Sequence, residues 1–210
     1  MDLIENKNSK FTFLGIALGG LSTTETAVAL IDRNMHIIML DKLFSISDVK
    51  YYLNNFAGKQ NAVILVSIPN NEVMLSSKWK YNSRTYDLVN FDTKMLNRED
   101  WTNRFSSRGC EYFRELKEQG IDIFRFDIEN MKQIYGNTFA YKDRSPMDCK
   151  SLQDTLRIKY NMHELPVNML PAAQLEALLG AVLARMLVID SDNFKCKNIG
   201  EFEGLPVVGI

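Results

Sequence analysis

The sequence is poor in the residues that build disulfide frameworks and histidine-based metal sites. It has three cysteines and two histidines in 210 residues. Cys110, Cys149 and Cys196 are far apart and form no Cys-x-x-Cys pair, so neither a disulfide scaffold nor a zinc site is expected. The histidines, His36 and His163, are also far apart, and a structural role is favoured for His36. This cysteine usage favours a reducing compartment.

The chain also lacks an excess of either charge and lacks a long hydrophobic run. Its 25 Lys and Arg residues nearly balance its 26 Asp and Glu residues. No overall field therefore draws the protein to nucleic acid or to an anionic membrane, and a nucleic-acid site would have to be a local patch. No segment has the roughly 20 apolar residues of a membrane span, and MDLIENKNSK lacks the pattern of a secretion signal. We expect a cytoplasmic protein with no membrane partner.

The hydrophobic content of 46% is sufficient for one sizeable core, and we expect a single domain over residues 1–210. Strands are expected at residues 10–18, 26–32 and 35–40, joined by turns as an antiparallel meander. A helix should follow at residues 45–56, with Val49, Tyr52 and Leu53 on one face. The run NAVILVSIP is apolar throughout, which is typical of a strand buried on both faces in a parallel arrangement.

The rest of the chain alternates helices and strands after a polar excursion at residues 70–108. A helix that Gly120 ends should precede a strand at residues 121–127. Ser145 and Pro146 give the start signal of a helix over residues 146–162. The apolar stripe of residues 171–190 predicts a mostly buried helix. A hairpin at residues 194–210 completes the domain.

A meander followed by a helix, a buried strand and further helices and strands is the ribonuclease-H-like order. It predicts an α/β fold in which a mixed sheet, the antiparallel three-strand meander plus parallel strands, carries helices on both faces. Over most of its length the chain resembles domain-of-unknown-function family 429 (DUF429), a family of predicted ribonuclease-H-like nucleases. The landmarks of this resemblance are LGIALGG, VILVSIP, LKEQGIDIFRFD and QLEALLGAVLA.

The resemblance implies metal-assisted phosphodiester hydrolysis, in which carboxylates hold two Mg²⁺ or Mn²⁺ ions. Its three expected acids match Ala17, Ser67 and Glu176, and only Glu176 carries a carboxylate. Glu176 would be a vestigial or partial catalytic and metal ligand, and the alternative is a polar residue at the rim of a buried helix. We therefore expect a weak or inactive nuclease that needs Mg²⁺ or Mn²⁺ only if it is active.

Other acids could replace the missing ligands in an active nuclease with a rearranged carboxylate set. None of them matches a family position, and each has an ordinary alternative. Asp32 is favoured as a turn former, and Asp148 as a favourable charge in the first turn of a helix. The full set of replacements considered is Glu25, Asp32, Asp41, Asp143 and Asp148.

The excursion at residues 70–108 interleaves cations with aromatic residues. Cations that meet phosphates and rings that stack on bases are the means by which proteins bind single-stranded nucleic acid. A solvated excursion whose aromatics pack on the core is the alternative. A third hypothesis is a non-catalytic interaction protein, a homo-oligomer or the partner of another protein, that uses the excursion or the terminal hairpin. The nucleic-acid candidates are Lys78, Lys80, Arg84, Arg98, Trp101, Arg104 and Arg108.

Overall fold

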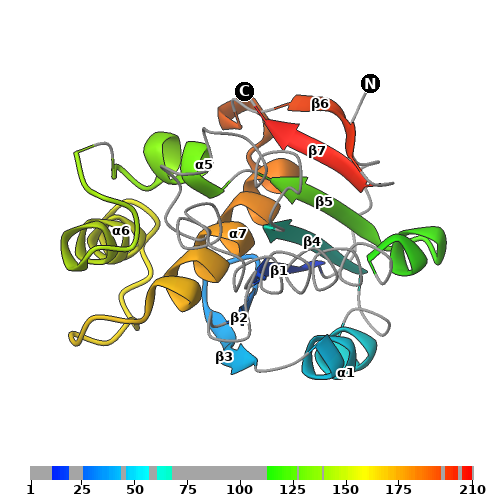
Figure 1. The fold of residues 1–210 in the computed structure, drawn as a ribbon, viewed down its shortest axis with the longest axis horizontal. Helices are drawn as coiled ribbons and strands as arrows, with labels where there is room; N and C mark the ends of the chain where they lie inside the picture. The colour runs from blue at the N-terminus through cyan, green and yellow to red at the C-terminus, as the bar shows by residue number, and fades with distance from the viewer. Residues whose placement is uncertain are drawn as a thin grey trace, which may run out of the picture.

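A computed structural model describes residues 11–18, 26–43, 46–56, 61–67, 113–126, 128–138, 140–194, 197–202 and 205–209. Within these residues the chain is an α/β fold built on one mixed sheet with the strand order β3-β2-β1-β4-β5-β7-β6 (Figure 1). The excursion expected at residues 70–108, with its seven nucleic-acid candidates, lies outside the described residues.

The first three strands form the expected antiparallel meander, with β1 at Phe11–Ala17, β2 at Thr26–Ile31 and β3 at Ile37–Leu43. The prediction for β3 was wrong by a few residues, because the strand starts later and continues to Leu43. Two local features delay its start. Met35 has a left-handed backbone (φ 70°), and Asp32 accepts hydrogen bonds from the amides of Asn34 (2.8 Å) and His36 (2.9 Å). The turn role of Asp32 is thereby confirmed.

The central strands are parallel and buried on both faces. Strand β4 (Asn61–Ser67) pairs in parallel with β1, and β5 (Asp122–Phe126) pairs in parallel with β4. On β4, Val63 and Leu65 pack into the core on one side of the sheet, whereas Ile64 and Val66 pack into the core on the other. The continuous apolar run NAVILVS therefore has the structure expected of it.

The expected terminal hairpin forms, with β6 at Lys197–Phe202 antiparallel to β7 at Leu205–Gly209. The hairpin also joins the main sheet, because β7 pairs in parallel with β5 through Arg125↔Val207 and Phe126↔Val208. The sequence pattern did not indicate this pairing, since a local hairpin signal carries no information about which distant strand the hairpin meets.

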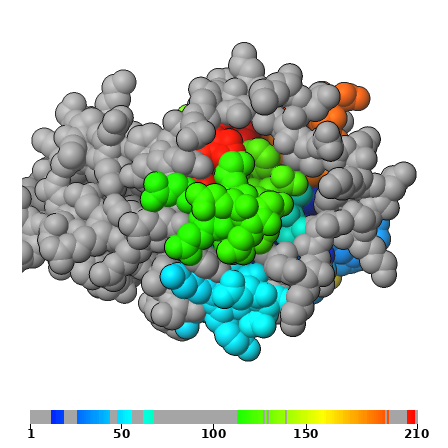
Figure 2. Space-filling view, turned by 90° about the vertical axis from the view of Figure 1, so that its right-hand side faces the viewer, coloured from blue at the N-terminus to red at the C-terminus, as the bar shows by residue number. Residues whose placement is uncertain are grey.

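Helices cover both faces of the sheet, as expected. Helices α5 (Ile128–Tyr135), α6 (Pro146–Ile158) and α7 (Ala172–Ile189) contribute to one core. Helix α1 (Ile46–Phe56) and the helical residues 113–118 contribute to the other through Leu53 and Phe113. Figure 2 shows these two segments next to each other on the molecular surface. Gly120, with a φ of 86°, ends the second of them as predicted.

Helix α6 begins as predicted and ends earlier than predicted. The side chain of Ser145 accepts a hydrogen bond from the amide of Asp148, and Pro146 occupies the first turn. The helix stops at Ile158 rather than at residue 162, because Asn161 is left-handed (φ 56°) and the amide of Met162 returns to the carbonyl of Leu156. This is the closing geometry of a left-handed helix end.

Helix α7 is the core helix of the fold. It contacts β1, β2 and β4 and crosses the sheet in Figure 1. Among the described residues it is the one helix long and apolar enough to cross a membrane by length and composition, and 72% of it is buried inside the fold. It lies so close to β1 that a Cβ atom on Gly15 would stand 1.9 Å from the carbonyl oxygen of Ala177.

Candidate functional site

The two neutral positions at which the resemblance expects acids lie side by side. Strands β1, β4 and β5 are parallel, so their carboxyl ends meet at one edge of the sheet. At this edge Ala17 and Ser67 are direct register partners, and both are buried. Ligand sites of open α/β sheets are found at such an edge. Here the two residues bring one methyl group and one hydroxyl group, and no carboxylate.

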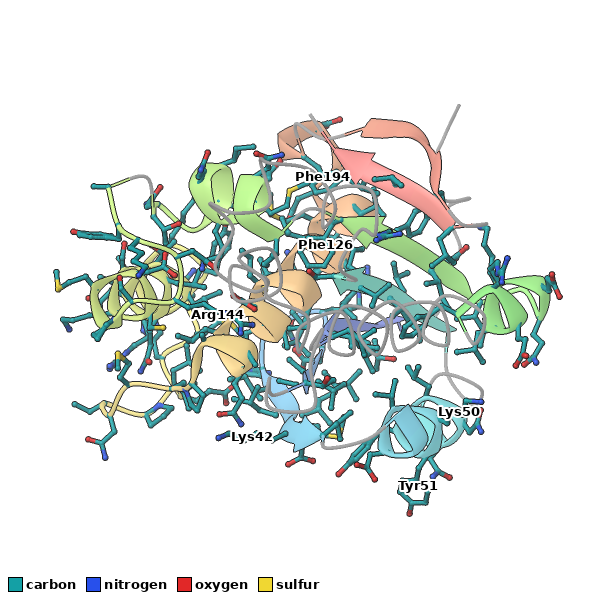
Figure 3. The ribbon with its side chains drawn as sticks, viewed as in Figure 1. Lys42, Lys50, Tyr51, Phe126, Arg144 and Phe194 are labelled. Carbon is teal, nitrogen blue, oxygen red and sulfur yellow. The ribbon has the colours of Figure 1, made fainter. Side chains whose placement is uncertain are left out.

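Glu176 lies in α7 with only 1% of its surface exposed. Its carboxylate is held by the guanidinium group of Arg144, which precedes α6. The Nε of Arg144 donates to Oε1 at 3.0 Å, and its Nη2 donates to Oε2 at 2.7 Å. Figure 3 shows Arg144 beside α7. Two parallel charge-assisted bonds form the strongest common pairing of a carboxylate with a cationic side chain.

A second cation, Lys132 of α5, completes the arrangement. Its ammonium group, with 3% of the side chain exposed, contacts the carboxylates of Asp143 and Asp148 and lies 3.7 Å from Oε1 of Glu176. Because α5 follows β5 directly, Lys132 stands at the same carboxyl edge of the sheet. We call Lys132, Asp143, Arg144, Asp148 and Glu176 the buried charge cluster.

The loop before α6 shapes this cluster. Arg144 has a left-handed backbone with a φ of 58°. That conformation costs a residue with a side chain on the order of 1–2 kcal/mol. The backbone amide of Arg144 donates to Oδ2 of Asp148 at 2.8 Å while its side chain grips Glu176. These bonds offset the cost, and they aim the guanidinium group at α7.

Mutual attraction favours the charged form of the two cations in the cluster. Burial alone would lower the pKa of Lys132, but the charges of Glu176 and Asp143 outweigh it and raise that pKa above its ordinary value. Burial likewise opposes the charge of Arg144, and the charge of Glu176 and its hydrogen bonds raise the Arg144 pKa. The nearby thiol of Cys149 has a raised pKa because it is buried and lies close to Asp148. It is therefore a poor nucleophile.

The pKa shifts predict a loss of stability in alkaline solution. The pKa of Lys132 is raised above 10.5, and burial raises the pKa of Tyr160 from 10.0 to about 12. The unfolded chain releases both protons at a lower pH than the folded chain does. The free energy of unfolding should therefore decrease as the pH rises above 10.0, the ordinary pKa of tyrosine. Urea unfolding followed by circular dichroism, from about pH 8 to about pH 11, measures that slope.

Tyr160→Phe is the matched variant for this slope. It removes one of the groups whose raised pKa contributes to the slope and also a hydrogen bond from the Tyr160 hydroxyl to the carbonyl of Tyr135 (3.1 Å). It should be less stable near neutral pH and should lose stability less steeply above pH 10. A free energy of unfolding that stays constant up to the highest pH would contradict the shifts of both groups.

The residues of the cluster do not fit a divalent metal ion. Mg²⁺ and Mn²⁺ need several oxygen ligands around a vacant centre. Here the ammonium group of Lys132 lies between the carboxylates, and Arg144 occupies both oxygens of Glu176. In the part of the chain that the structure describes, no three His, Cys, Asp or Glu side chains are grouped to hold a metal. An incoming dication would have to displace two bound cations.

Two of the acids considered as replacement ligands, Asp32 and Asp41, lie apart from the buried charge cluster. Asp32 accepts backbone amides in its turn and pairs with Nδ1 of the exposed His36 at 3.0 Å. Asp41 accepts a hydrogen bond from the hydroxyl of Tyr52 at 2.9 Å. Glu25 lies outside the described residues. Of the four that lie in the described residues, the structure brings only Asp143 and Asp148 to Glu176, and Asp148 is both at the start of α6 and a member of the cluster.

The two cations of the cluster, Lys132 and Arg144, were not among the site residues predicted from the sequence. For Lys132 a signal was present, because Ile128, Met131, Lys132 and Tyr135 follow the spacing of one helical face and three of the four are apolar. A lysine within such a face needs a buried anionic partner. Arg144 had no comparable signal, since it lies in a loop.

No family model, curated protein or solved structure matches the chain. The fold and the geometry of the cluster therefore carry the functional argument.

Proposed function

We propose that this chain is a ribonuclease-H-like protein that has lost metal-dependent hydrolysis and acts by binding. The order β3-β2-β1-β4-β5, with an antiparallel meander and parallel β1, β4 and β5, supports the fold comparison. Ala17 and Ser67 are adjacent at the carboxyl edge, where the resemblance expects two acids. A cytoplasmic location and the DUF429 relationship are parts of the same proposal.

The main observation in favour of lost hydrolysis is that cationic side chains of the protein bind Glu176, the one expected acid that is present. Glu176 binds Arg144 through both oxygens and lies next to Lys132. A two-metal nuclease needs carboxylates that are open to ions about 4 Å apart. In this chain the positive charges next to Glu176 are the side chains of Arg144 and Lys132, which occupy the place that metal ions would take in a nuclease. The cluster then joins α5, α6 and α7, a structural role that needs no substrate.

An active nuclease with a rearranged carboxylate set is the second candidate. Asp143 and Asp148 favour it, because they meet Glu176 around a single ammonium group. It requires Lys132 to leave the centre and Arg144 to release Glu176 before metal enters. Breaking buried, hydrogen-bonded ion pairs costs several kcal/mol, so we rank this candidate below the first.

Cleavage assays separate the two candidates. Labelled RNA, DNA, hybrid and branched substrates are incubated with Mg²⁺ or Mn²⁺ and the folded protein. We expect no metal-dependent cleavage above the buffer control, because no ligand set is open. Metal-dependent cleavage that Glu176→Gln abolishes and Asp154→Asn retains would overturn the proposal, since Asp154 is an exposed carboxylate of α6 in an ion pair with Lys150.

The same substrates test the binding half of the proposal. Titration of labelled single-stranded nucleic acid at low salt should show binding that weakens as salt rises, because the nucleic-acid candidates at residues 78–108 include six basic side chains beside Trp101. Absence of binding at low salt would leave the protein-interaction alternative. Sedimentation then distinguishes a homo-oligomer from a monomer.

A further inference from the structure

Strand β3 is the last strand on its side of the sheet. Within the described residues it pairs with β2 along one edge, and no strand pairs with its other edge (Figure 1). Its first half, Ile37 to Leu40, consists of four apolar residues, and Ile38 is 54% exposed. The backbone groups at the outer edge of such a strand can form a ladder with a strand of another molecule. An apolar outer strand therefore needs protection against self-association.

A carboxylate from the loop between α6 and α7 contacts this edge. Oε1 of Glu164 accepts a hydrogen bond from the backbone amide of Ile37, 127 positions earlier in the chain. Neighbouring strands lie about 4.7–4.9 Å apart, so an added strand would bring a carbonyl oxygen to the place where this carboxylate oxygen lies. Glu164 thus occupies one of the positions that an added strand would need.

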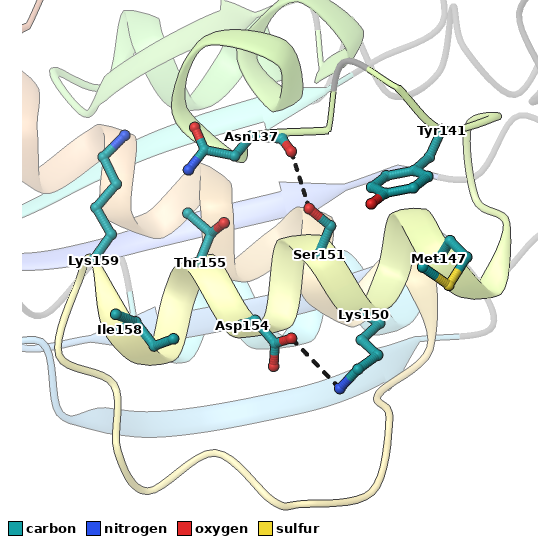
Figure 4. A pocket seen from close by; sticks show the side chains of 9 residues that line it. All are labelled: Asn137, Tyr141, Met147, Lys150, Ser151, Asp154, Thr155, Ile158 and Lys159. Atoms are coloured by element: carbon teal, nitrogen blue, oxygen red, sulfur yellow. Dashed lines mark hydrogen bonds and ion pairs between the residues drawn. The ribbon is translucent and has the colours of Figure 1, made fainter.

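The loop that carries Glu164 is fixed by contacts of its own. After the end of α6 the chain turns back along the helix before it enters α7 (Figure 4). Leu165, the next residue after Glu164, is buried, and so is Gln153 of α6, whose side chain makes three hydrogen bonds to the loop. Its partners are the carbonyl oxygens of Pro166 (2.7 Å) and Asn168 (3.1 Å) and the amide of Leu170 (2.8 Å). Because the backbone is already held, the contact with β3 orders little more than one side chain.

A shift of register protects the same part of the edge. In the pairing with β2, Ile31 is opposite Ile37, and the preceding residue, Leu30, is opposite Met39. Ile38 is therefore an additional residue in the outer strand. An additional residue bends and twists an edge strand and interrupts the regular spacing of the groups that a new strand must meet. The shift is adjacent to the amide that the carboxylate covers, so two independent features act at one point of the edge.

We propose that Glu164 is an autoinhibitory contact that keeps the apolar edge of β3 from pairing with a second copy of this chain. The second copy is the partner because every molecule presents the same apolar edge, and two identical strands can pair antiparallel about a twofold axis. The proposal does not rest on the lost hydrolysis, because neither Glu164 nor β3 belongs to the buried charge cluster.

Sedimentation velocity of the full chain, over about a hundredfold range of protein concentration, tests the proposal. Glu164→Ala should tighten the Kd of self-association by at least about tenfold relative to the unchanged protein. Glu164→Gln keeps an oxygen acceptor in the same place and should associate less than Glu164→Ala. Glu118→Ala is the matched control, because it removes one exposed carboxylate from the helical residues 113–118, and it should leave association unchanged.

Two further measurements assign the effect to β3. Adding Ile38→Lys to Glu164→Ala places a charge on the exposed side chain of the edge and should reverse the gain in association. At the lowest protein concentration, hydrogen exchange followed by NMR should show a protected Ile37 amide in the unchanged protein and at least about tenfold faster exchange in Glu164→Ala. Thermal unfolding verifies that each variant is folded, which we expect because Gln153 still holds the loop.

Three results would each overturn the proposal. The first is that Glu164→Ala associates no more strongly than Glu118→Ala. The second is a gain in association that Ile38→Lys does not reverse, because the copies would then meet at another surface. The third is an unprotected Ile37 amide in the unchanged protein, because the contact with Glu164 would then be too weak to close the edge.

Discussion

Replacing Gly15 with alanine is expected to destabilise the fold by more than about 4 kcal/mol, which is a large part of the stability of an ordinary domain. A Cβ atom at this position would stand 1.9 Å from the carbonyl oxygen of Ala177 and 2.3 Å from the amide nitrogen of Ala181. Both atoms are backbone atoms of α7, so no side-chain rotation can make room. Either β1 or the whole helix must move. Urea unfolding and the yield of soluble protein measure the effect.

Gly180→Ala is the matched control, because Gly180 is the α7 residue that faces Gly15. Its added Cβ would meet the Cα of Gly15 and the Cζ of Phe126, each at 3.2 Å. This strain is smaller, and alanine favours a helix over glycine by about 1 kcal/mol. The control should therefore change the free energy of unfolding by less than about 1 kcal/mol. Equal stability of the Gly15 variant and the unchanged protein would show that β1 and α7 are farther apart.

Replacing Lys132 with methionine should cost about 3–5 kcal/mol of stability, the usual loss when one partner of a buried ion pair is removed. The variant keeps the apolar length of the side chain and leaves the carboxylates of Asp143 and Asp148 without their shared ammonium group. Glu176 keeps Arg144 as its partner. The free energy of unfolding from urea titration at neutral pH measures the loss.

Two further variants assign that loss to charge. Lys150→Met removes an exposed lysine from an exposed ion pair with Asp154, and it should cost less than about 1 kcal/mol. Combining Lys132→Met with Asp148→Asn removes one of the unpaired charges and should recover part of the stability. Strict additivity of the two changes would contradict direct coupling between these side chains.

Much of the fold was predictable because its signals are local. Glycine and polar turns separate the meander strands, and Ser145 with Pro146 marks the start of α6. The broad apolar stripe of α7 required burial, and the helix is the centre of the core. The predicted ends of elements were wrong where one left-handed residue sets them, as Met35 does before β3 and Asn161 does after α6. Residue type alone does not fix those conformations.

The candidate site was less predictable because its contacts are long-range. The sequence drew attention to Glu176, Asp143 and Asp148, but the cations that join them come from a helix face and from a loop. The bond from Arg144 to Glu176 spans 32 positions, and it depends on how α6 packs against α7. A single sequence records neither that packing nor the left-handed backbone that aims Arg144. The sequence can predict that a buried acid needs a cationic partner, but it cannot predict which cation that partner is.

The place of β7 in the sheet has a consequence for how the chain folds during synthesis. Strand β5 has β4 on one side and β7 on the other, and β7 is made after α5, α6, α7 and β6. One edge of β5 therefore stays open while α5, α6, α7 and β6 emerge from the ribosome. An open strand edge in a half-made chain can pair with another molecule. Helix α7, which contacts all three strands of the meander, is also made after them, so their apolar side chains on that face have no cover until the helix is complete.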